Sequence, residues 1–219
     1  MGFDPVKDFK PVGQIATTQN VIVIHPTQPI QDVKGLINYA RANPGKLTYG
    51  SSGVGSTLHL SGELFSRMAG IELLHAPYKG SGPARADLLG GHIPMMFSDV
   101  GTMIPLIQSG KLRALAVTGT RRDAKLPDVP TVAEAGSDGY AVESWYGLAV
   151  PVATPDAVAQ RLQAALTTVL QKPEVHQKLA ELGSVAARDT SPEHLATVIT
   201  AEMRQWAPVV RRAGIQLDD

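Results

Sequence analysis

Short apolar runs alternate with helix-like patterns in the first part of this chain, and this alternation restricts the fold more than any other feature. The runs that predict buried strands lie at residues 21–24, 47–49, 93–97 and 112–117. Between them, apolar residues recur at helical spacing, as at residues 33–40. The run at 112–117 is apolar throughout, which is typical of a parallel sheet with both faces covered. The sequence therefore predicts an α/β fold.

The chain after Pro151 is predicted to be mostly helical. Helical patterns lie at residues 155–171, 173–182 and 191–213, with a short apolar run at 185–187. Trp145 and Tyr146 lie inside the preceding apolar run, which predicts that both belong to the core. Pro208 is predicted to kink or end the last helix.

These helices have apolar faces that the available strands are too few to cover. In the first of them, apolar residues follow one another at four-residue steps, namely Val158, Leu162, Leu166 and Leu170. Uncovered apolar surface and open sheet edges favour association between chains. We therefore expect an incomplete sheet and a homo-oligomer formed through this surface.

Composition excludes several classes of protein. The 219 residues include 20 basic and 20 acidic side chains, so no global field attracts nucleic acid or an anionic membrane. The absence of cysteine excludes disulfides, thiolate metal sites and cysteine nucleophiles. No apolar run approaches the roughly 18 residues of a membrane span. Residues 1–5 lack the basic and apolar regions of a signal peptide, which predicts that the chain as written stays in the cytoplasm.

Residues 49–60 combine a strand, a loop of glycines and hydroxyl residues, and the start of a helix. Such a loop lets the backbone approach a ligand closely, and the first turn of a helix offers N–H groups without intrahelical partners. A second loop of this kind, at residues 76–83, adds the positive charge of Lys79. Together the two loops predict a site for a carboxylate or a phosphate. The alternative is purely structural, since Ser56 or Thr57 would serve equally well to cap the helix that follows.

Tests for catalytic or cofactor sites fail. The spacing around Ser51 does not fit a nucleophile elbow, and neither the P-loop nor the dinucleotide fingerprint is present. Six histidines are scattered without metal-ligand spacing, so we expect no metal and no cofactor. His59 fits a buried structural residue better than a base. Asp99 ends a predicted strand, where it either faces a ligand or caps the next helix.

A series of segments resembles the Bug-type substrate-binding receptors of tripartite tricarboxylate transporters. These segments are residues 4–9, 51–65, 75–80, 88–91, 110–117, 126–136 and 213–215. The resemblance implies an α/β fold like that of type II periplasmic binding proteins, with two lobes that close on a small organic anion. It also implies a chain that lacks the N-terminal part of its first lobe, in agreement with the incomplete sheet. We expect such a chain to bind carboxylates weakly or not at all.

On this resemblance, residues 1–19 are a first-lobe remnant and crossover, 20–145 a nearly complete second lobe, and 146–219 the returning part of the first lobe. The implied ligand-binding residues are Ser51, Ser52, Gly53, Gly55, Ser56, Thr57, Tyr78, Lys79, Gly80, Ser81 and Asp99. The implied ligand is a dicarboxylate, a tricarboxylate, an acidic amino acid or an aromatic acid. The implied partners are the membrane components of the transporter, and the implied location is the periplasm.

Two other functions remain open from the sequence. One is an α/β enzyme that acts on an anionic substrate through Ser52, His59 or Asp99. The other is an interaction module or a fragment that keeps the fold but no longer binds a ligand. Because no nucleophile, base and orienting group come together in the sequence, we expect a receptor without catalytic residues.

Overall fold

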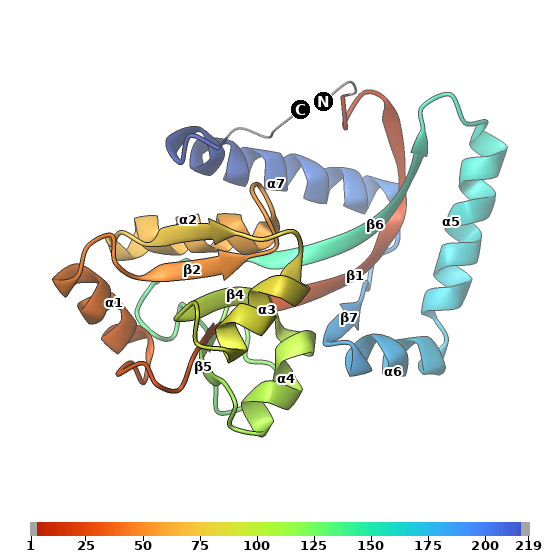
Figure 1. Cartoon of the computed structure of the whole chain (residues 1–219). Coiled ribbons are helices and arrows are strands. Elements are labelled where there is room, and N and C mark those ends of the chain that lie inside the picture. Colours follow the sequence, from red (N-terminus) through yellow and green to blue (C-terminus); the bar gives the residue numbers. More distant parts are fainter. Residues whose placement is uncertain (1–3, 216–219) are drawn as a thin grey trace. The chain divides into compact units, whose positions relative to one another are not determined.

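The computed structural model describes residues 4–215, so residues 1–3 and 216–219 of the expected terminal segments lie outside it. The described chain forms two compact units. One contains residues 19–143 and 209–215, and the other contains residues 4–18 and 144–208. Strand β1 (Phe9–Ile24) contributes to both units, and each unit is described separately below (Figure 1).

The unit around residues 19–143 is an α/β layer structure. Its sheet has the strand order β3-β2-β4-β1-β5. The strands besides β1 are β2 (Thr48–Ser51), β3 (Leu74–Pro77), β4 (Met95–Asp99) and β5 (Arg113–Val117). The helices are α1 (Val33–Ala42), α2 (Thr57–Ala69), α3 (Ser81–Leu89) and α4 (Val100–Gln108). The expected α/β fold is thus confirmed.

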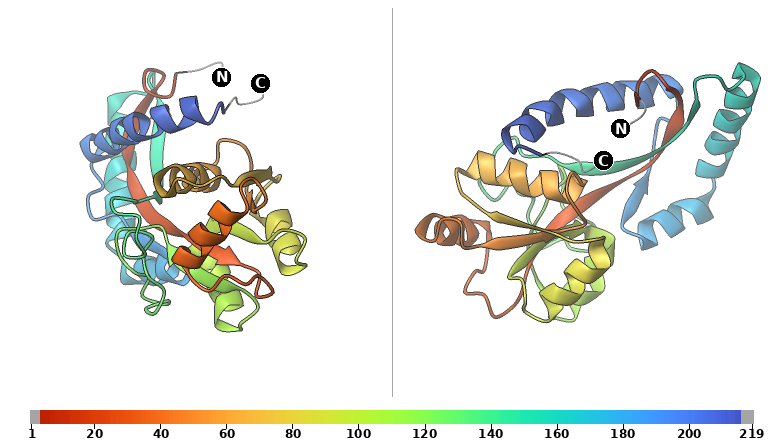
Figure 2. Two further views of the ribbon diagram at one scale, coloured as in Figure 1. Left: turned by 90° about the vertical axis from the view of Figure 1, so that its left-hand side faces the viewer. Right: turned by 45° about the horizontal axis from the view of Figure 1, so that its top comes forward.

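Helices cover both faces of this sheet, as two further views show (Figure 2). On one face, Val21 and Val23 of β1 and Met96 of β4 form a buried cluster with residues of α3 and α4. On the other face, Phe97 of β4 packs against Phe65 of α2, with ring centroids 6.2 Å apart. The alternation of side chains along each strand therefore divides the core between two helical layers.

The direction of the strands places the candidate loops. Strand β2 is parallel to both β3 and β4, so the carboxyl ends of these three strands lie at one edge of the sheet. Helices α2, α3 and α4 follow these strands directly or after a short loop, and their N-termini therefore lie at the same edge. In open α/β sheets this edge is where ligands bind.

The second unit contains two further strands and three helices. The strands are β6 (Glu143–Pro151) and β7 (Ser184–Ala186), and both pair with β1. The helices are α5 (Asp156–Leu170), α6 (Pro173–Glu181) and α7 (Pro192–Arg212), and Ser191 caps α7 through its hydroxyl at 3.2 Å from the amide of His194. Within residues 4–215, no helix is both long and apolar enough to cross a membrane.

The uncovered helix face that the sequence predicts is present in part. On α5, Val158 is 47% exposed and Leu162 is 37% exposed, while Leu170 at the end of the helix is buried. Leu182 after α6 is the most exposed of the large apolar side chains that the structure describes. The outer surface of α5 thus carries apolar side chains in water.

Two expectations for the sheet were wrong. First, the sheet is mixed rather than parallel, because β1 runs antiparallel to its neighbours β4 and β5. The apolar character of residues 112–117 reflects burial on both faces and does not reveal strand direction. Second, β1 begins at Phe9, well before the predicted start at residue 21. Polar residues such as Gln14 and Asn20, both buried, conceal in the sequence the part of β1 that precedes residue 21.

The structure also tests two local expectations. Trp145 and Tyr146 were expected in the core, but Trp145 is only partly buried and Tyr146 is 50% exposed. Pro208 was expected to kink or end the last helix; it does not end it, since α7 continues to Arg212 with Pro208 inside it, and the kink stays a prediction.

Candidate functional site

Two loops lie side by side at the carboxyl edge of the parallel strands. The loop of residues 52–56 follows β2, and the loop of residues 78–80 follows β3. The amide of Tyr78 donates a hydrogen bond to the carbonyl of Ser51 at 3.3 Å, and the amide of Gly80 donates to the carbonyl of Ser52 at 3.2 Å. The two loops predicted from the sequence are therefore one continuous surface of backbone.

Glycines give these loops their shape. Gly53 has a φ of 135°, Gly55 a φ of 75° and Gly80 a φ of 103°, all in the region that other residues rarely adopt. A Cβ atom on Gly53 would also lie 3.2 Å from the carbonyl oxygen of Tyr78. The sharp path of the first loop therefore depends on the absence of side chains at Gly53 and Gly55.

The capping role of Ser56 is confirmed. Its hydroxyl accepts a hydrogen bond from the amide of His59 at 3.2 Å and donates one to the carbonyl of Gly53 at 2.8 Å. Thr57 is the first residue of α2. The first-turn amides of this helix carry the positive end of the helix dipole to the edge where the loops meet.

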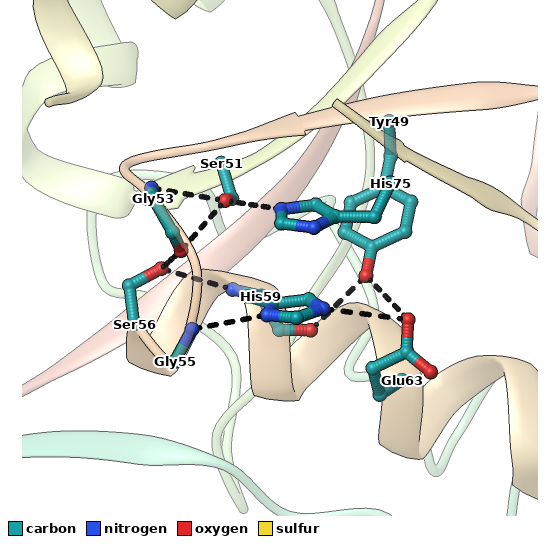
Figure 3. A network of polar contacts seen from close by, with 8 residues as sticks. All are labelled: Tyr49, Ser51, Gly53, Gly55, Ser56, His59, Glu63 and His75. Atoms are coloured by element: carbon teal, nitrogen blue, oxygen red, sulfur yellow. Dashed lines mark hydrogen bonds and ion pairs between the residues drawn. The ribbon is translucent and has the colours of Figure 1, made fainter. Parts of the chain in front are cut away.

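Ser51 lies beneath the loop rather than on its surface. Its side chain is fully buried, and its hydroxyl accepts a hydrogen bond from the amide of Gly53 at 3.1 Å. The same oxygen lies 2.6 Å from Nε2 of His75 (Figure 3). Ser51 therefore holds the loop from below, whereas Ser52, next along the chain, is partly exposed.

His59 supports the same loop from the helix side. This residue is 5% exposed, and its Nδ1 accepts a hydrogen bond from the amide of Gly55 at 3.1 Å. The ring stacks on His75, with centroids 3.6 Å apart and planes inclined by only 7° (Figure 3). The prediction that His59 is a buried, hydrogen-bonded residue is confirmed.

Burial and neighbouring charges determine the protonation of the side chains around His59, namely His75, Glu63 and Tyr49. Burial, together with the neighbouring His59, lowers the pKa of His75 from its ordinary 6.5 to about 4, so its ring is neutral at neutral pH. The nearby ring of His59, with Nε2 3.7 Å from Oε1, lowers the pKa of Glu63 despite its partial burial, and Tyr49 donates a hydrogen bond to the same carboxylate at 2.9 Å. Burial raises the pKa of Tyr49, so its hydroxyl keeps its proton.

Asp99 ends β4 at the same edge of the sheet. Its main chain pairs with Asn20 of β1, and it precedes α4 in the N-cap position, yet its side chain makes no capping hydrogen bond. Burial raises the pKa of its carboxyl group. Within residues 4–215, the side chain of Asp99 has no hydrogen bond or ion pair with another residue. A partly buried carboxylate without a protein partner is available to a ligand that donates hydrogen bonds.

The second loop offers different groups from those expected. The hydroxyl of Tyr78 already donates to the carboxylate of Asp87 at 2.7 Å, so this tyrosine anchors the loop to α3. Lys79 is exposed, and Ser81 is the first residue of α3. Gly80 occupies the N-cap position, where no side chain satisfies the first amides of α3. The loop thus presents backbone N–H groups and one cation.

The structure brings most of the predicted site residues into this pair of loops. These are Ser51, Ser52, Gly53, Gly55, Ser56, Thr57, Tyr78, Lys79, Gly80 and Ser81, with Asp99 at the end of the neighbouring strand β4. Sequence reasoning missed the supporting layer of Tyr49, Glu63 and His75. The one signal in the sequence for this supporting layer was the position of His75 in β3, the strand that leads into the second loop.

Ser51 and His75 have the separation of a nucleophile and its base, but their surroundings do not suit catalysis. Ser51 is fully buried, so a substrate cannot reach its hydroxyl. The ring of His75 faces His59 instead of a carboxylate that would stabilise its protonated form. Within the described residues, no group of three potential ligands is arranged to hold a metal ion. The geometry fits binding better than chemistry.

Comparison with known proteins identifies the family. The sequence profile of the tripartite tricarboxylate transporter family receptor, TctC, matches residues 1–215. The chain belongs to this family. It is 32% identical to the protein BugT of Bordetella pertussis over 97% of its own length. The resemblance to Bug-type receptors is thereby confirmed, and the family is one of receptors rather than enzymes.

Solved structures show the same fold. Rpa4515 of R. palustris, solved with adipate, has a TM-score of 0.89 and 38% identity, with 98% of this chain and 72% of that chain covered. MatC (Rpa3494) of Rhodopseudomonas palustris, with bound malate, has a TM-score of 0.87 and 29% identity, with 95% of this chain and 72% of that chain covered. The chain spans 61%, 55% and 65% of the length of three curated relatives.

Proposed function

We propose that this chain forms the ligand-binding part of an extracytoplasmic receptor for a small carboxylate, which the receptor delivers to a tripartite tricarboxylate transporter. The observation that carries the proposal is the pair of adjoining glycine loops at the carboxyl edge of three parallel strands. The N-termini of α2 and α3, which lie at this edge, and the ammonium group of Lys79 suit an anion. The adipate and malate in two similar structures support a dicarboxylate.

The proposal also assigns the residues of the chain to two lobes. Residues 20–145 would form the lobe that carries both anion-binding loops, and residues 1–19 and 146–219 would belong to the opposite lobe. Closure of two lobes would remove the carboxylate from water and strengthen its charged hydrogen bonds. Membrane components of the transporter would be the protein partner, and the periplasm would be the site of action.

Titration calorimetry with adipate and malate tests the function. We expect at least one of these dicarboxylates to bind, and its diamide to bind at least about tenfold more weakly, because a hydrogen bond to a charged group contributes about 1.5–3 kcal/mol. Equal affinity for diacid and diamide would contradict an anion site. Incubation of the same samples followed by product analysis tests the enzyme alternative, since turnover would overturn the receptor proposal.

Lys79→Met tests whether the exposed cation of the second loop contributes to charge recognition. We expect the variant to lose more affinity for a dicarboxylate than for the matching monocarboxylate, by a factor of about three to ten, because a second negative charge gains more from a nearby ammonium group. Lys46→Met, outside both loops, is the matched control and leaves both affinities unchanged. Equal losses for the two ligands in Lys79→Met would show that Lys79 is only a surface charge.

Self-association is the expected behaviour of the apolar face of α5. Val158 and Leu162 lie one helical turn apart and are both exposed, so pairing of two copies would bury them. Light scattering over a range of concentrations is expected to show a mass above that of one chain. The double variant Val158→Glu, Leu162→Lys adds a favourable charge pair on the helix and should restore the monomer. A wild-type monomer at every concentration would contradict this prediction.

A further inference from the structure

The first loop is held from below by two stacked imidazole rings. His59 comes from α2 and His75 from β3, and their ring centroids are 3.6 Å apart (Figure 3). Each ring fixes a different part of the loop. His59 accepts the hydrogen bond of the Gly55 amide through Nδ1, and His75 binds the Ser51 hydroxyl, which in turn accepts the hydrogen bond of the Gly53 amide.

The contact to Gly55 specifies the protonation of His59. Because the amide of Gly55 is a donor, Nδ1 must carry a lone pair and no proton. The remaining ring nitrogen, Nε2, lies 3.7 Å from Oε1 of Glu63. A second proton on His59 would place two N–H groups face to face at Gly55, and the hydrogen bond that shapes the loop would be lost.

The surroundings of the pair contain one compensating charge. The titratable groups that face the two rings are Glu63 from α2 and Tyr49 from β2, with the hydroxyl of Tyr49 bonded to both Glu63 and the carbonyl of His59. Glu63 can balance one positive charge on the pair. Two imidazolium rings in van der Waals contact would repel each other, so the loop is compatible with at most one proton beyond the neutral pair.

We propose that His59 and His75 are positioning residues whose unprotonated form holds the 52–56 loop in its anion-binding shape, so that acidification releases the carboxylate. This inference rests on the proposed function, because the affinity that it concerns is the affinity of the loop for a carboxylate. The sign follows from the contacts. The ligand-binding shape requires the unprotonated acceptor Nδ1, so binding is retained at neutral pH and lost as the pH falls.

The lowered pKa of His75 supports the same direction. Between its ordinary value of 6.5 and about 4, the unfolded chain binds more protons than the folded chain does. The stability that depends on the neutral ring is therefore present above pH 6.5 and is lost as the pH falls toward about 4. Local opening of the loop is a less costly way to admit the proton than global unfolding.

The experiment uses the chain with adipate or malate as the probe, whichever binds at about pH 7.5, and measures its affinity down to about pH 4.5. The variant His59→Asn keeps an acceptor near the position of Nδ1 and cannot take up a proton. Between these two pH values, we expect the affinity of the wild type to fall by a factor at least about ten times larger than the factor for His59→Asn. The control His25→Gln, at a histidine outside both loops whose ring bonds to Thr27, should follow the wild type.

Direct observation of the loop separates this inference from the proposed function. In the chain without ligand, the NMR signal of the Gly55 amide should shift together with the His59 ring signals as the pH falls. If no carboxylate binds at any pH, the proposed function fails, while the amide titration still decides the inference. A Gly55 amide that is unchanged while His59 becomes protonated would overturn it, and so would equal pH dependence of affinity in the wild type and His59→Asn.

Discussion

Replacing Gly53 or Gly55 by valine is expected to reduce carboxylate affinity by at least about tenfold, which is the largest effect on binding that a single substitution should produce. Both glycines have positive φ, and a β-branched side chain is strongly disfavoured there. A side chain on Gly53 would also press on the carbonyl of Tyr78 and push the two loops apart. Calorimetry with the dicarboxylate that the wild type binds measures the loss.

Gly70→Val is the matched control for these two variants. Gly70 has a φ of 60° at the C-cap of α2, and no atom lies within 4 Å of the Cβ that a substitution would add. The control therefore shares the backbone strain, about 1–2 kcal/mol, but leaves the loop untouched. All three variants are expected to lose stability, with the largest loss at Gly53, where the added side chain also meets the carbonyl of Tyr78, and only Gly53 and Gly55 are expected to lose affinity. Retained affinity in both loop variants would place the site elsewhere.

The sequence predicts the helices and the order of elements better than the sheet. Helix α1 begins after Asp32, whose side chain caps it, and ends at Asn43, both of which are local signals. The direction of β1 has no such signal. Its pairing with β4 and β5 depends on residues more than 70 positions away along the chain, and its buried Asn20 donates from the backbone amide to Thr118 and from Nδ2 to Ser61 instead of to local neighbours. Only the folded chain shows these partners.

The candidate site also has one part that the sequence predicts and one part that it does not. The loops are predictable because glycine and hydroxyl residues are needed where a strand turns sharply into a helix, as at Gly53 and Ser56. The layer beneath the loops is not predictable, because its residues Tyr49, Glu63 and His75 come from three different elements that meet only in the folded chain. The sequence also presents Ser51 as a ligand contact, although its burial makes it a support. Composition indicates what a loop can bind, but exposure decides which of its groups can do so.

Gly62 and Gly82 are expected to respond to alanine with opposite signs. Both lie within helices, where alanine is intrinsically favoured over glycine by about 1 kcal/mol. In α3 the Cβ of Gly82→Ala would meet no atom within 4 Å, so the variant should be more stable by about 0.5–1 kcal/mol. In α2 the Cβ of Gly62→Ala would overlap the ring of Tyr49, at 2.4 Å from Cε2 and 2.5 Å from Cζ.

Tyr49 cannot move aside to accept this methyl group. Its ring is fully buried between His75 and Phe97, and its hydroxyl is bonded to Glu63 and to the carbonyl of His59. Displacing it would strain the core and disturb the histidine pair, so we expect Gly62→Ala to lower the free energy of unfolding by about 1–3 kcal/mol. Urea denaturation of both variants measures the two changes. A gain of stability at Gly62 equal to that at Gly82 would show that α2 can move away from β2, and that the layer beneath the ligand loop is less tightly packed than its contacts indicate.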